Sequence, residues 1–326
     1  MLEIIIYAIL FMLLATTLAL FYQWFDRKIH ARYQHRVGPL ITGPHGILQP
    51  LADLIKLLTK EEIIPEGSDE KVIYISAILS VSLVLFVLLF IPIFSYKGLL
   101  SFEGDLLIII AISVIVSLLM VIAAYSTKGP FSNIGAARTL ELIISYEIPF
   151  ILSVASVAIL VRSITISEIV RNTTNTLPPV IFAPIAFIAY ILSTVAKVEK
   201  VPFDIPEAET ELGAGWLTEF SGRTLAMFRL SLDLKLFFMA SLGAVLFFGG
   251  TGLGFSINPF IDPLIAFLIF FIKVTLIVFI VTTIRSIVAR YRIDQAMNIF
   301  WRWIIPLSIL QIILIIVLRC FEIVQI

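Results

Sequence analysis

Charged residues are scarce in this sequence, and cysteine is almost absent. Asp, Glu, Lys and Arg make up 14% of the 326 residues, whereas about 25% is usual in a soluble domain. The chain therefore has too few charges to cover a water-facing surface of its size. The single cysteine, Cys320, excludes an internal disulfide and an iron–sulfur cluster held by cysteines of this chain. The formal net charge is zero, so no basic excess indicates a nucleic-acid partner.

Long apolar blocks take the place of the missing charge. Sixty per cent of the residues are hydrophobic, and blocks of about 20 apolar residues can cross the ~30 Å hydrocarbon core as helices. Helices also satisfy their own backbone hydrogen bonds in lipid. We expect an all-α integral membrane protein, a single polytopic membrane domain over residues 1–326. Its eight predicted spans lie near residues 4–25, 72–95, 105–126, 139–161, 180–196, 228–249, 262–284 and 302–320. The first block has no basic segment before it and no small-residue cleavage site, so it is interpreted as a retained helix.

The basic residues predict the topology. Of the 23 Lys and Arg residues, 17 follow the first, third, fifth and seventh spans, and only four lie on the opposite side. By the positive-inside rule both termini face outward, and the cytoplasmic loops are 26–71, 127–138, 197–228 and 285–301. Within the first loop, residues 46–60 have the spacing of an amphipathic helix that lies at the membrane surface or against a partner. No span repeats another, so inverted transporter repeats find no support.

Two acidic residues lie inside a predicted span. Glu141 and Glu147 occur in Glu-Leu-Ile-Ile-Ser-Tyr-Glu, with the hydroxyls of Ser145 and Tyr146 beside them. Ionisable groups at membrane depth are costly and indicate function, and a file of carboxylates and hydroxyls suits proton transfer. The alternative is a pair of structural salt bridges between helices, to Arg138 or to Lys235.

The loop after the fifth span is dense in charge. Eight ionisable residues lie between Lys197 and Glu219. Asp204-Ile205-Pro206-Glu207 fits a helix capping box, with Asp204 as the N-cap, which would place Glu207 and Glu211 on one helical face. Clustered carboxylates raise one another's pKa, as proton exchange near neutrality requires. The alternative, a solvated acidic loop, is weakened by the apolar residues interleaved with the acids.

No cofactor site is evident. His30, His35 and His45 lack the spacing of a zinc or haem site and are interpreted as polar loop residues. No glycine-rich nucleotide loop follows a strand. We therefore predict no catalytic residue and no metal ligand in this chain.

Short motifs along the whole chain resemble the eight-helix membrane subunit of respiratory complex I that forms the quinone cavity, and its relatives in energy-converting group 4 nickel–iron hydrogenases. The motifs carrying the resemblance are Asp26-Arg27-Lys28, Arg36-Val37-Gly38-Pro39, residues 46–53 with Lys56 and Lys60-Glu61, Gly135-Ala136-Ala137-Arg138, Ser145-Tyr146-Glu147, Pro202-Phe203-Asp204 with the acids to Glu211, Glu219-Phe220-Ser221-Gly222, and Arg292-Ile293-Asp294-Gln295.

The resemblance implies a subunit in the cell membrane that docks a peripheral redox arm and relays redox change into H⁺ or Na⁺ translocation. It assigns to the ion path the acids Glu141, Glu147, Asp204, Glu207, Glu209, Glu211 and Glu219. It assigns to the docking surface and the cavity mouth Arg27, Arg36, Asp53, Lys56, Glu61, Lys200, Arg292 and Asp294. The implied partners are hydrogenase-like large and small subunits, an iron–sulfur subunit and antiporter-like membrane subunits, which would hold the iron–sulfur clusters and any nickel–iron site.

One departure bears on the branch of the family. Quinone-reducing members carry Glu-Thr-Asn-Arg where this chain has Lys197-Val198-Glu199-Lys200, and lysine cannot supply the bidentate fork of arginine. We therefore expect a ferredoxin-linked hydrogenase or sulfur-reductase complex. The alternatives are the quinone-binding subunit of an NADH-quinone oxidoreductase and a stand-alone ion transporter.

Overall fold

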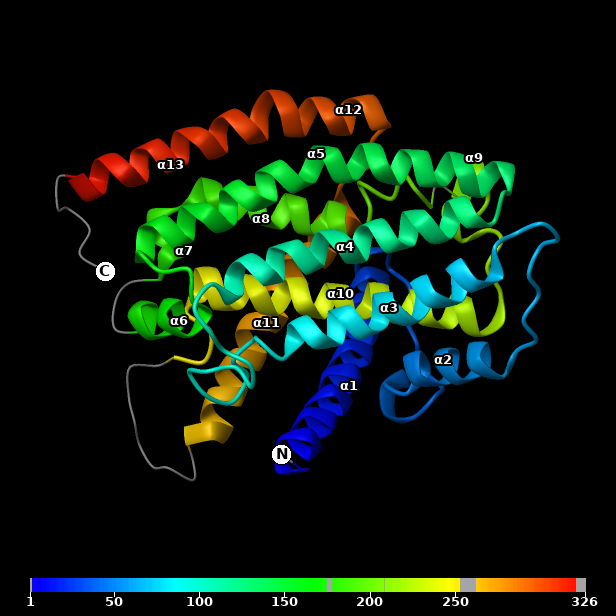
Figure 1. Cartoon of the computed structure of the whole chain (residues 1–326), viewed down its shortest axis with the longest axis horizontal. Coiled ribbons are helices and arrows are strands. Elements are labelled where there is room, and N and C mark those ends of the chain that lie inside the picture. The colour runs from blue at the N-terminus through cyan, green and yellow to red at the C-terminus, as the bar shows by residue number, and fades with distance from the viewer. Residues whose placement is uncertain (1, 175–177, 208, 253–261, 321–326) are drawn as a thin grey trace.

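The chain folds into a bundle of helices in a computed structural model that describes residues 2–174, 178–207, 209–252 and 262–320 (Figure 1). Within these ranges every regular element is helical. The long apolar helices are α1 (Leu2–Tyr33), α3 (Glu70–Leu88), α4 (Asp105–Ser126), α5 (Pro130–Val161), α10 (Gly222–Phe248), α11 (Asp262–Ile287) and the continuous run of α12 (Ile293–Asn298), the π-helical η3 (Ile299–Ile304) and α13 (Ile305–Cys320). The shorter elements are η1 (Pro44–Gly46), α2 (Gln49–Thr59), α6 (Ile166–Thr174), α7 (Pro179–Phe182), α8 (Pro184–Lys197), α9 (Glu209–Leu212) and η2 (Gly215–Leu217).

The predicted class, an all-α integral membrane protein, is confirmed. Seven helices in the described part of the chain are long and apolar enough to cross a membrane. The span predicted at 180–196 is instead divided into α7 and α8, because Pro184 has no amide hydrogen with which to continue α7. With 14 residues, α8 is only about 21 Å long. The count of eight crossings and the outward termini remain predictions.

Several helices end at other residues than hydropathy predicts. Helix α1 continues to Tyr33 and α5 already starts at Pro130, so both extend beyond their apolar segments into the predicted cytoplasmic loops. Helix α3 ends at Leu88, well before residue 95. Tight i→i+3 bonds over residues 89–91 close its last turn, and Pro92 follows.

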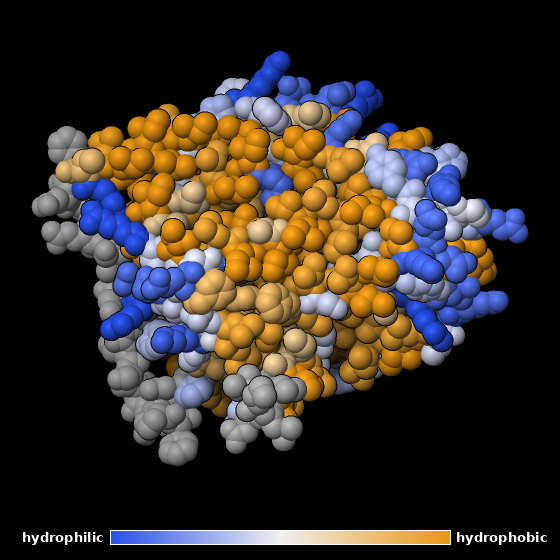
Figure 2. Space-filling model, in the orientation of Figure 1, coloured by the Kyte–Doolittle hydropathy of each residue, from blue (hydrophilic) through white to orange (hydrophobic). Residues whose placement is uncertain are grey.

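Helix α10 is the centre of the bundle. Its residues Leu234–Phe247 are all buried, and it packs against α1, α2, α3 and α11. The outer helices bury one side only, and their exposed apolar side chains form a broad hydrophobic band (Figure 2). Hydrophilic residues gather at the end of the bundle where α2 and α9 lie. This distribution is that of a multi-pass membrane protein.

The amphipathic helix predicted at 46–60 is present as α2. It packs against α1 and α10 at the hydrophilic end of the bundle. Pro50 is buried, whereas Leu51, Ile55 and Leu58 remain exposed. An apolar face of α2 is therefore free for lipid or for a partner.

Gly135 permits the closest approach between α5 and the charged loop. A Cβ at this position would lie 2.5 Å from the backbone nitrogen of Trp216 and 2.9 Å from the carbonyl carbon of Gly215. Real Cβ atoms do not tolerate such distances, so the backbone of η2 can lie on α5 only because residue 135 has no side chain.

We expect Gly135→Ala to destabilise the protein by about 1–3 kcal/mol, the usual cost of overpacking. The measurement is the midpoint of heat-induced aggregation in detergent. Ala137→Ser, on the same turn but partly exposed, serves as the control and is expected to leave the midpoint unchanged. Equal midpoints for the two variants would contradict the close-packing argument.

Candidate functional site: a charged cavity and a buried ion-pair cluster

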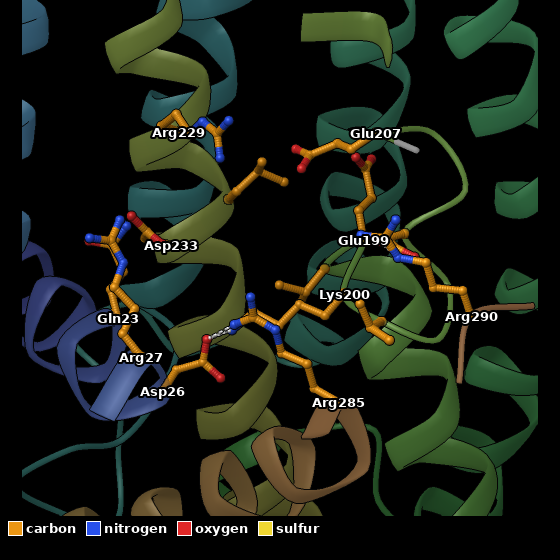
Figure 3. A pocket seen from close by; sticks show the side chains of 14 residues that line it. Gln23, Asp26, Arg27, Glu199, Lys200, Glu207, Arg229, Asp233, Arg285 and Arg290 are labelled. Carbon is orange, nitrogen blue, oxygen red and sulfur yellow. Dashed lines mark hydrogen bonds and ion pairs between the residues drawn. The ribbon is translucent and has the colours of Figure 1, made fainter. Parts of the chain in front are cut away.

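A charged cavity lies at the hydrophilic end of the bundle, between α1, α10, α11 and the loop after α8 (Figure 3). Its volume is about 250 Å³. Ten of the residues that line it are ionisable, and acids and bases balance: Asp26, Glu199, Asp204, Glu207 and Asp233 against Arg27, Lys200, Arg229, Arg285 and Arg290. The cavity therefore suits a polar group better than an apolar one.

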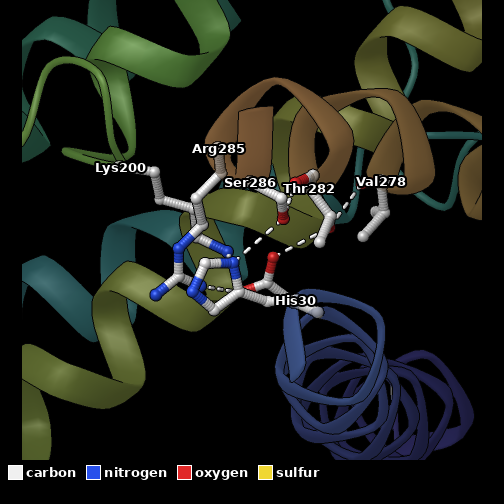
Figure 4. Close-up of polar contacts among 7 residues, drawn as sticks. His30, Lys200, Val278, Thr282, Arg285 and Ser286 are labelled. Carbon is white, nitrogen blue, oxygen red and sulfur yellow. Dashed lines mark hydrogen bonds and ion pairs between the residues drawn. The ribbon is translucent and has the colours of Figure 1, made fainter. Parts of the chain in front are cut away.

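Asp26 lines this cavity and connects three elements through its hydrogen bonds. Its carboxylate accepts a hydrogen bond from Lys200 at 2.7 Å, one from Thr282 at 2.8 Å and one from Arg285. These donors come from the loop after α8 and from α11 (Figure 4). Asp26 itself lies on α1. Ser286 of α11 also contacts His30, with 2.9 Å between its hydroxyl and Nδ1. The Asp26 side chain is 4% exposed, so its charge depends on these partners.

A second, smaller cavity of about 180 Å³ lies between α1, α2 and α10. It shares Gln23, Arg27, Arg229 and Asp233 with the charged cavity, so the two adjoin. At this side Arg27 pairs with Asp53 of α2 at 2.7 Å, and Gln49 donates to the same carboxylate at 3.0 Å. Burial alone would raise the pKa of Asp53, but the bonds from Arg27 and Gln49 outweigh it and lower the pKa. Asp53 is therefore held as a carboxylate.

Deeper in the bundle lies an inner cluster, formed by Glu147, Lys197, Glu199 and Lys235. Lys197 is fully buried and donates to Glu147 at 2.8 Å and to Ser113 at 2.9 Å. Its ammonium also lies 4.2 Å from the ring centroid of Phe150, which favours the cation. Lys235 donates to Ser117 at 2.9 Å and is close enough to interact electrostatically with the other three members.

Glu199 joins the inner cluster to the charged cavity, because it lines the cavity and interacts with Lys235. The indole of Trp216 donates to its carboxylate at 2.8 Å. Burial raises the pKa of Glu199 above its ordinary value, although Lys235 and Trp216 act in the opposite direction. Burial likewise lowers the pKa of Lys200 despite the opposing charge of Asp26. Both groups are therefore closer to exchanging a proton near neutrality than free side chains are.

The structure brings some of the predicted site residues together and separates others. Arg27, Lys200, Asp204 and Glu207 line the charged cavity, and Asp53 and Lys56 line its neighbour. Glu147 belongs to the inner cluster. Outside both cavities are Arg36, Glu61, Glu141, Glu211, Glu219, Arg292 and Asp294, of which only Glu219 is partly buried. The side chain of Glu209 is outside the described part of the structure.

The capping box predicted at Asp204 is wrong. Residues 205–207 form a turn, and α9 begins only at Glu209. The side chain of Asp204 pairs instead with Arg290 at 2.8 Å. Consequently Glu207 and Glu211 do not share a helical face: Glu207 lines the cavity, while Glu211 accepts a hydrogen bond from Arg138 at 2.6 Å. A Cβ on Gly215 would lie 1.7 Å from the carbonyl oxygen of Pro206, so this turn folds directly onto η2.

The ion pair considered for Glu147 exists, but with Lys197 in place of Arg138 or Lys235. Six further residues line the charged cavity and are not among the predicted site residues, namely Asp26, Glu199, Arg229, Asp233, Arg285 and Arg290. Asp233 lies within the predicted span 228–249. The criterion that identified Glu141 and Glu147, an ionisable group inside a span, could have found it.

The histidines differ from one another. His30 lies in the last turn of α1, not in a loop, and lines no cavity described above. His35 lies in the turn after α1 and His45 lies in the short 3-10 helix η1, and both have positive φ. Among the described residues, no three His, Cys, Asp or Glu side chains are grouped as a metal ion would require.

The fold and the site define a class: a multi-pass helical membrane protein with a charge-lined cavity at one end and buried ion pairs beneath it. A family model described as NADH dehydrogenase matches residues 5–316, and the chain belongs to this family. Its relatives include the H subunit of the NADH-quinone oxidoreductase of Dehalococcoides mccartyi, 32% identical over 98% of this chain and 87% of the relative. The corresponding protein of Thermomicrobium roseum is 34% identical over 95% and 94% of the two chains, and that of Pelagibacter ubique is 31% identical over 94% and 92%.

We expect Asp26→Asn to destabilise the protein by about 3–5 kcal/mol, because it leaves Lys200 and Arg285 without their common carboxylate. Asp204→Asn is the matched control, since its partner Arg290 is 44% exposed and such a pair contributes only about 0–1 kcal/mol. The midpoint of thermal unfolding in detergent would be compared for both variants. A smaller shift for Asp26→Asn than for Asp204→Asn would refute the central role of Asp26.

Proposed function

We propose that this chain is the membrane subunit of a complex I-like NADH-quinone oxidoreductase, that it holds a quinone headgroup in the charged cavity, and that it relays the redox change to ion translocation. The observation that carries the proposal is the continuity of charge from the cavity through Glu199 to the inner cluster. The names of the relatives support quinone as the substrate, in preference to the hydrogenase-type role expected from the sequence.

The coupling would act through electrostatics. At an effective dielectric constant of about 20, one new unit charge about 10 Å away contributes about 1.7 kcal/mol, somewhat more than one pKa unit. Reduction of a headgroup in the cavity would thus favour proton uptake by Glu199. Because Lys235 interacts with both Glu199 and Glu147, the change would spread to the inner cluster. Oε2 of Glu147 is buried and has no hydrogen-bond partner among the described residues, so it offers an acceptor for a transferred proton.

Entry and docking would use the same end of the molecule. The smaller cavity between α1 and α2, with Asp53 and Lys56 in its wall, would provide an access route to the charged cavity that it adjoins. Arg36, Glu61, Arg292 and Asp294 are exposed on segments predicted to be cytoplasmic. They would contact a peripheral redox arm, whose subunits carry the iron–sulfur clusters.

A second candidate is the membrane subunit of a ferredoxin-linked hydrogenase or sulfur reductase. Lysines at positions 197 and 200 favour it. Lys197 neutralises Glu147 inside the bundle, and Lys200 contacts Asp26 through a single nitrogen, whereas an arginine would offer a fork of donors.

We expect Glu147→Gln to lower the number of ions translocated per electron, while electron transfer continues in part. Glutamine has the same shape as glutamate, but it cannot carry a negative charge or take up the transferred proton. Inverted membrane vesicles would report both rates, with Glu103→Gln, an exposed loop position, as the control. Unchanged coupling in Glu147→Gln would remove Glu147 from the path.

The substrate is tested with the purified whole complex. A photoreactive ubiquinone analogue is expected to label the residues that line the two cavities, and excess decylubiquinone should suppress the labelling. If labelling does not saturate but reduced ferredoxin drives evolution of H₂ or of H₂S from polysulfide, the second candidate is correct. Ion flux through the purified single chain in liposomes would instead indicate a stand-alone transporter.

A further inference from the structure

Glu141 is an acidic side chain exposed on a helix that crosses the membrane. It lies on α5, and all the other exposed residues of this helix are apolar, although the exposed Glu211 is bound to Arg138 one turn away. Ile134 precedes it, and Ile144 and Ile148 follow, with 47%, 56% and 39% of their surfaces exposed. A carboxylate in such surroundings faces hydrocarbon unless another protein covers it.

The depth of Glu141 follows from the pairing of α4 with α5. Ser132 donates to the carbonyl of Ala124, and Tyr146 donates to Ser117, so the two helices run antiparallel in a fixed register. Glu141 is therefore level with about residue 120 of α4, and about 9 Å from the end of that helix at Ser126. Ile134 and Ile144 are exposed on either side of this level, so the apolar surface of α5 continues past Glu141 in both directions.

This chain supplies no cation for Glu141. Arg138, one turn earlier, is bound to Glu211, and Lys197 is bound to Glu147. Every Lys, Arg and His of the chain is among the described residues, and none of their side-chain nitrogens lies within 4.0 Å of the Glu141 carboxylate. No described side chain or backbone amide donates a hydrogen bond to it either.

We propose that the face of α5 formed by Ile134, Glu141, Ile144, Ile148 and Ile151 binds a membrane-spanning helix of another subunit, and that this helix places a Lys or Arg side chain against Glu141. Ionisable groups at membrane depth are costly unless paired. A neutral donor would leave the net charge in the hydrocarbon region, whereas a basic side chain removes it. The inference rests on the proposed function only in that the chain works within a multisubunit membrane complex.

Photo-crosslinking in the assembled complex tests the interface. A benzophenone amino acid at Ile144 is expected to form an adduct with a membrane-spanning segment that has a Lys or Arg within one turn of the attachment point. The same label at Leu276 of α11, an exposed apolar position about 13 Å from Arg285 along its helix, measures the background. Adducts with lipid alone, or with a segment that has no basic residue, would overturn the proposal.

Charge-reversal variants test the ion pair between Glu141 and the basic residue of the partner. Glu141→Lys is expected to lower the amount of the partner that copurifies by about tenfold, a free energy of about 1.4 kcal/mol. Changing the partner's basic residue to Glu in the same strain should restore it. If the Glu141→Lys variant assembles like the wild type, the ion pair is refuted.

If labelling at Ile144 yields only lipid adducts while the complex still pumps ions, this proposal fails and the proposed function stands. Conversely, if quinone labelling does not saturate while the Ile144 adduct with a basic segment still forms, the proposed function fails and this proposal stands.

Discussion

The arrangement of the site depends on the neutralisation of Asp26. A carboxylate that is 4% exposed cannot remain ionised without close partners, and here they come from α11 and from the loop after α8. This requirement draws three segments together that are far apart in the sequence. The cavity is the space that remains around the junction, so the same interactions that close the fold also create the site.

Charge balance extends from this junction into the membrane. The cavity has equal numbers of acids and bases, and the inner cluster has two of each. The segment Lys197-Val198-Glu199-Lys200 supplies charges to both groups. Lys197 pairs with Glu147, Glu199 interacts with Lys235 and Trp216, and Lys200 pairs with Asp26. Each charge of this segment therefore has a partner of opposite sign.

Hydropathy predicted the helices well because the bilayer fixes both their length and their composition. It failed at 180–196, where Pro184 divides the segment, and at the ends of α1 and α5, which continue as helix beyond their apolar segments. The capping box at Asp204 failed for a different reason. A short Asp-x-x-Glu pattern records local preference only, whereas Asp204 takes a partner 86 residues further along the chain, Arg290. Long-range ion pairs cannot be read from one sequence, because helix packing selects the partner.

The two glutamates of α5 show how helix geometry separates roles that look alike in the sequence. Glu141 and Glu147 are six residues apart, which rotates their side chains by about 240° around the axis and shifts them by about 9 Å along it. Glu147 consequently faces the interior and finds Lys197, while Glu141 faces outward and finds no cation of this chain. Two carboxylates of one helix lie on the same face only when they are three or four residues apart. Glu141 and Glu147 therefore cannot pass a proton directly to each other. Any contribution of Glu141 to an ion path would therefore have to involve groups that lie against the outer face of α5.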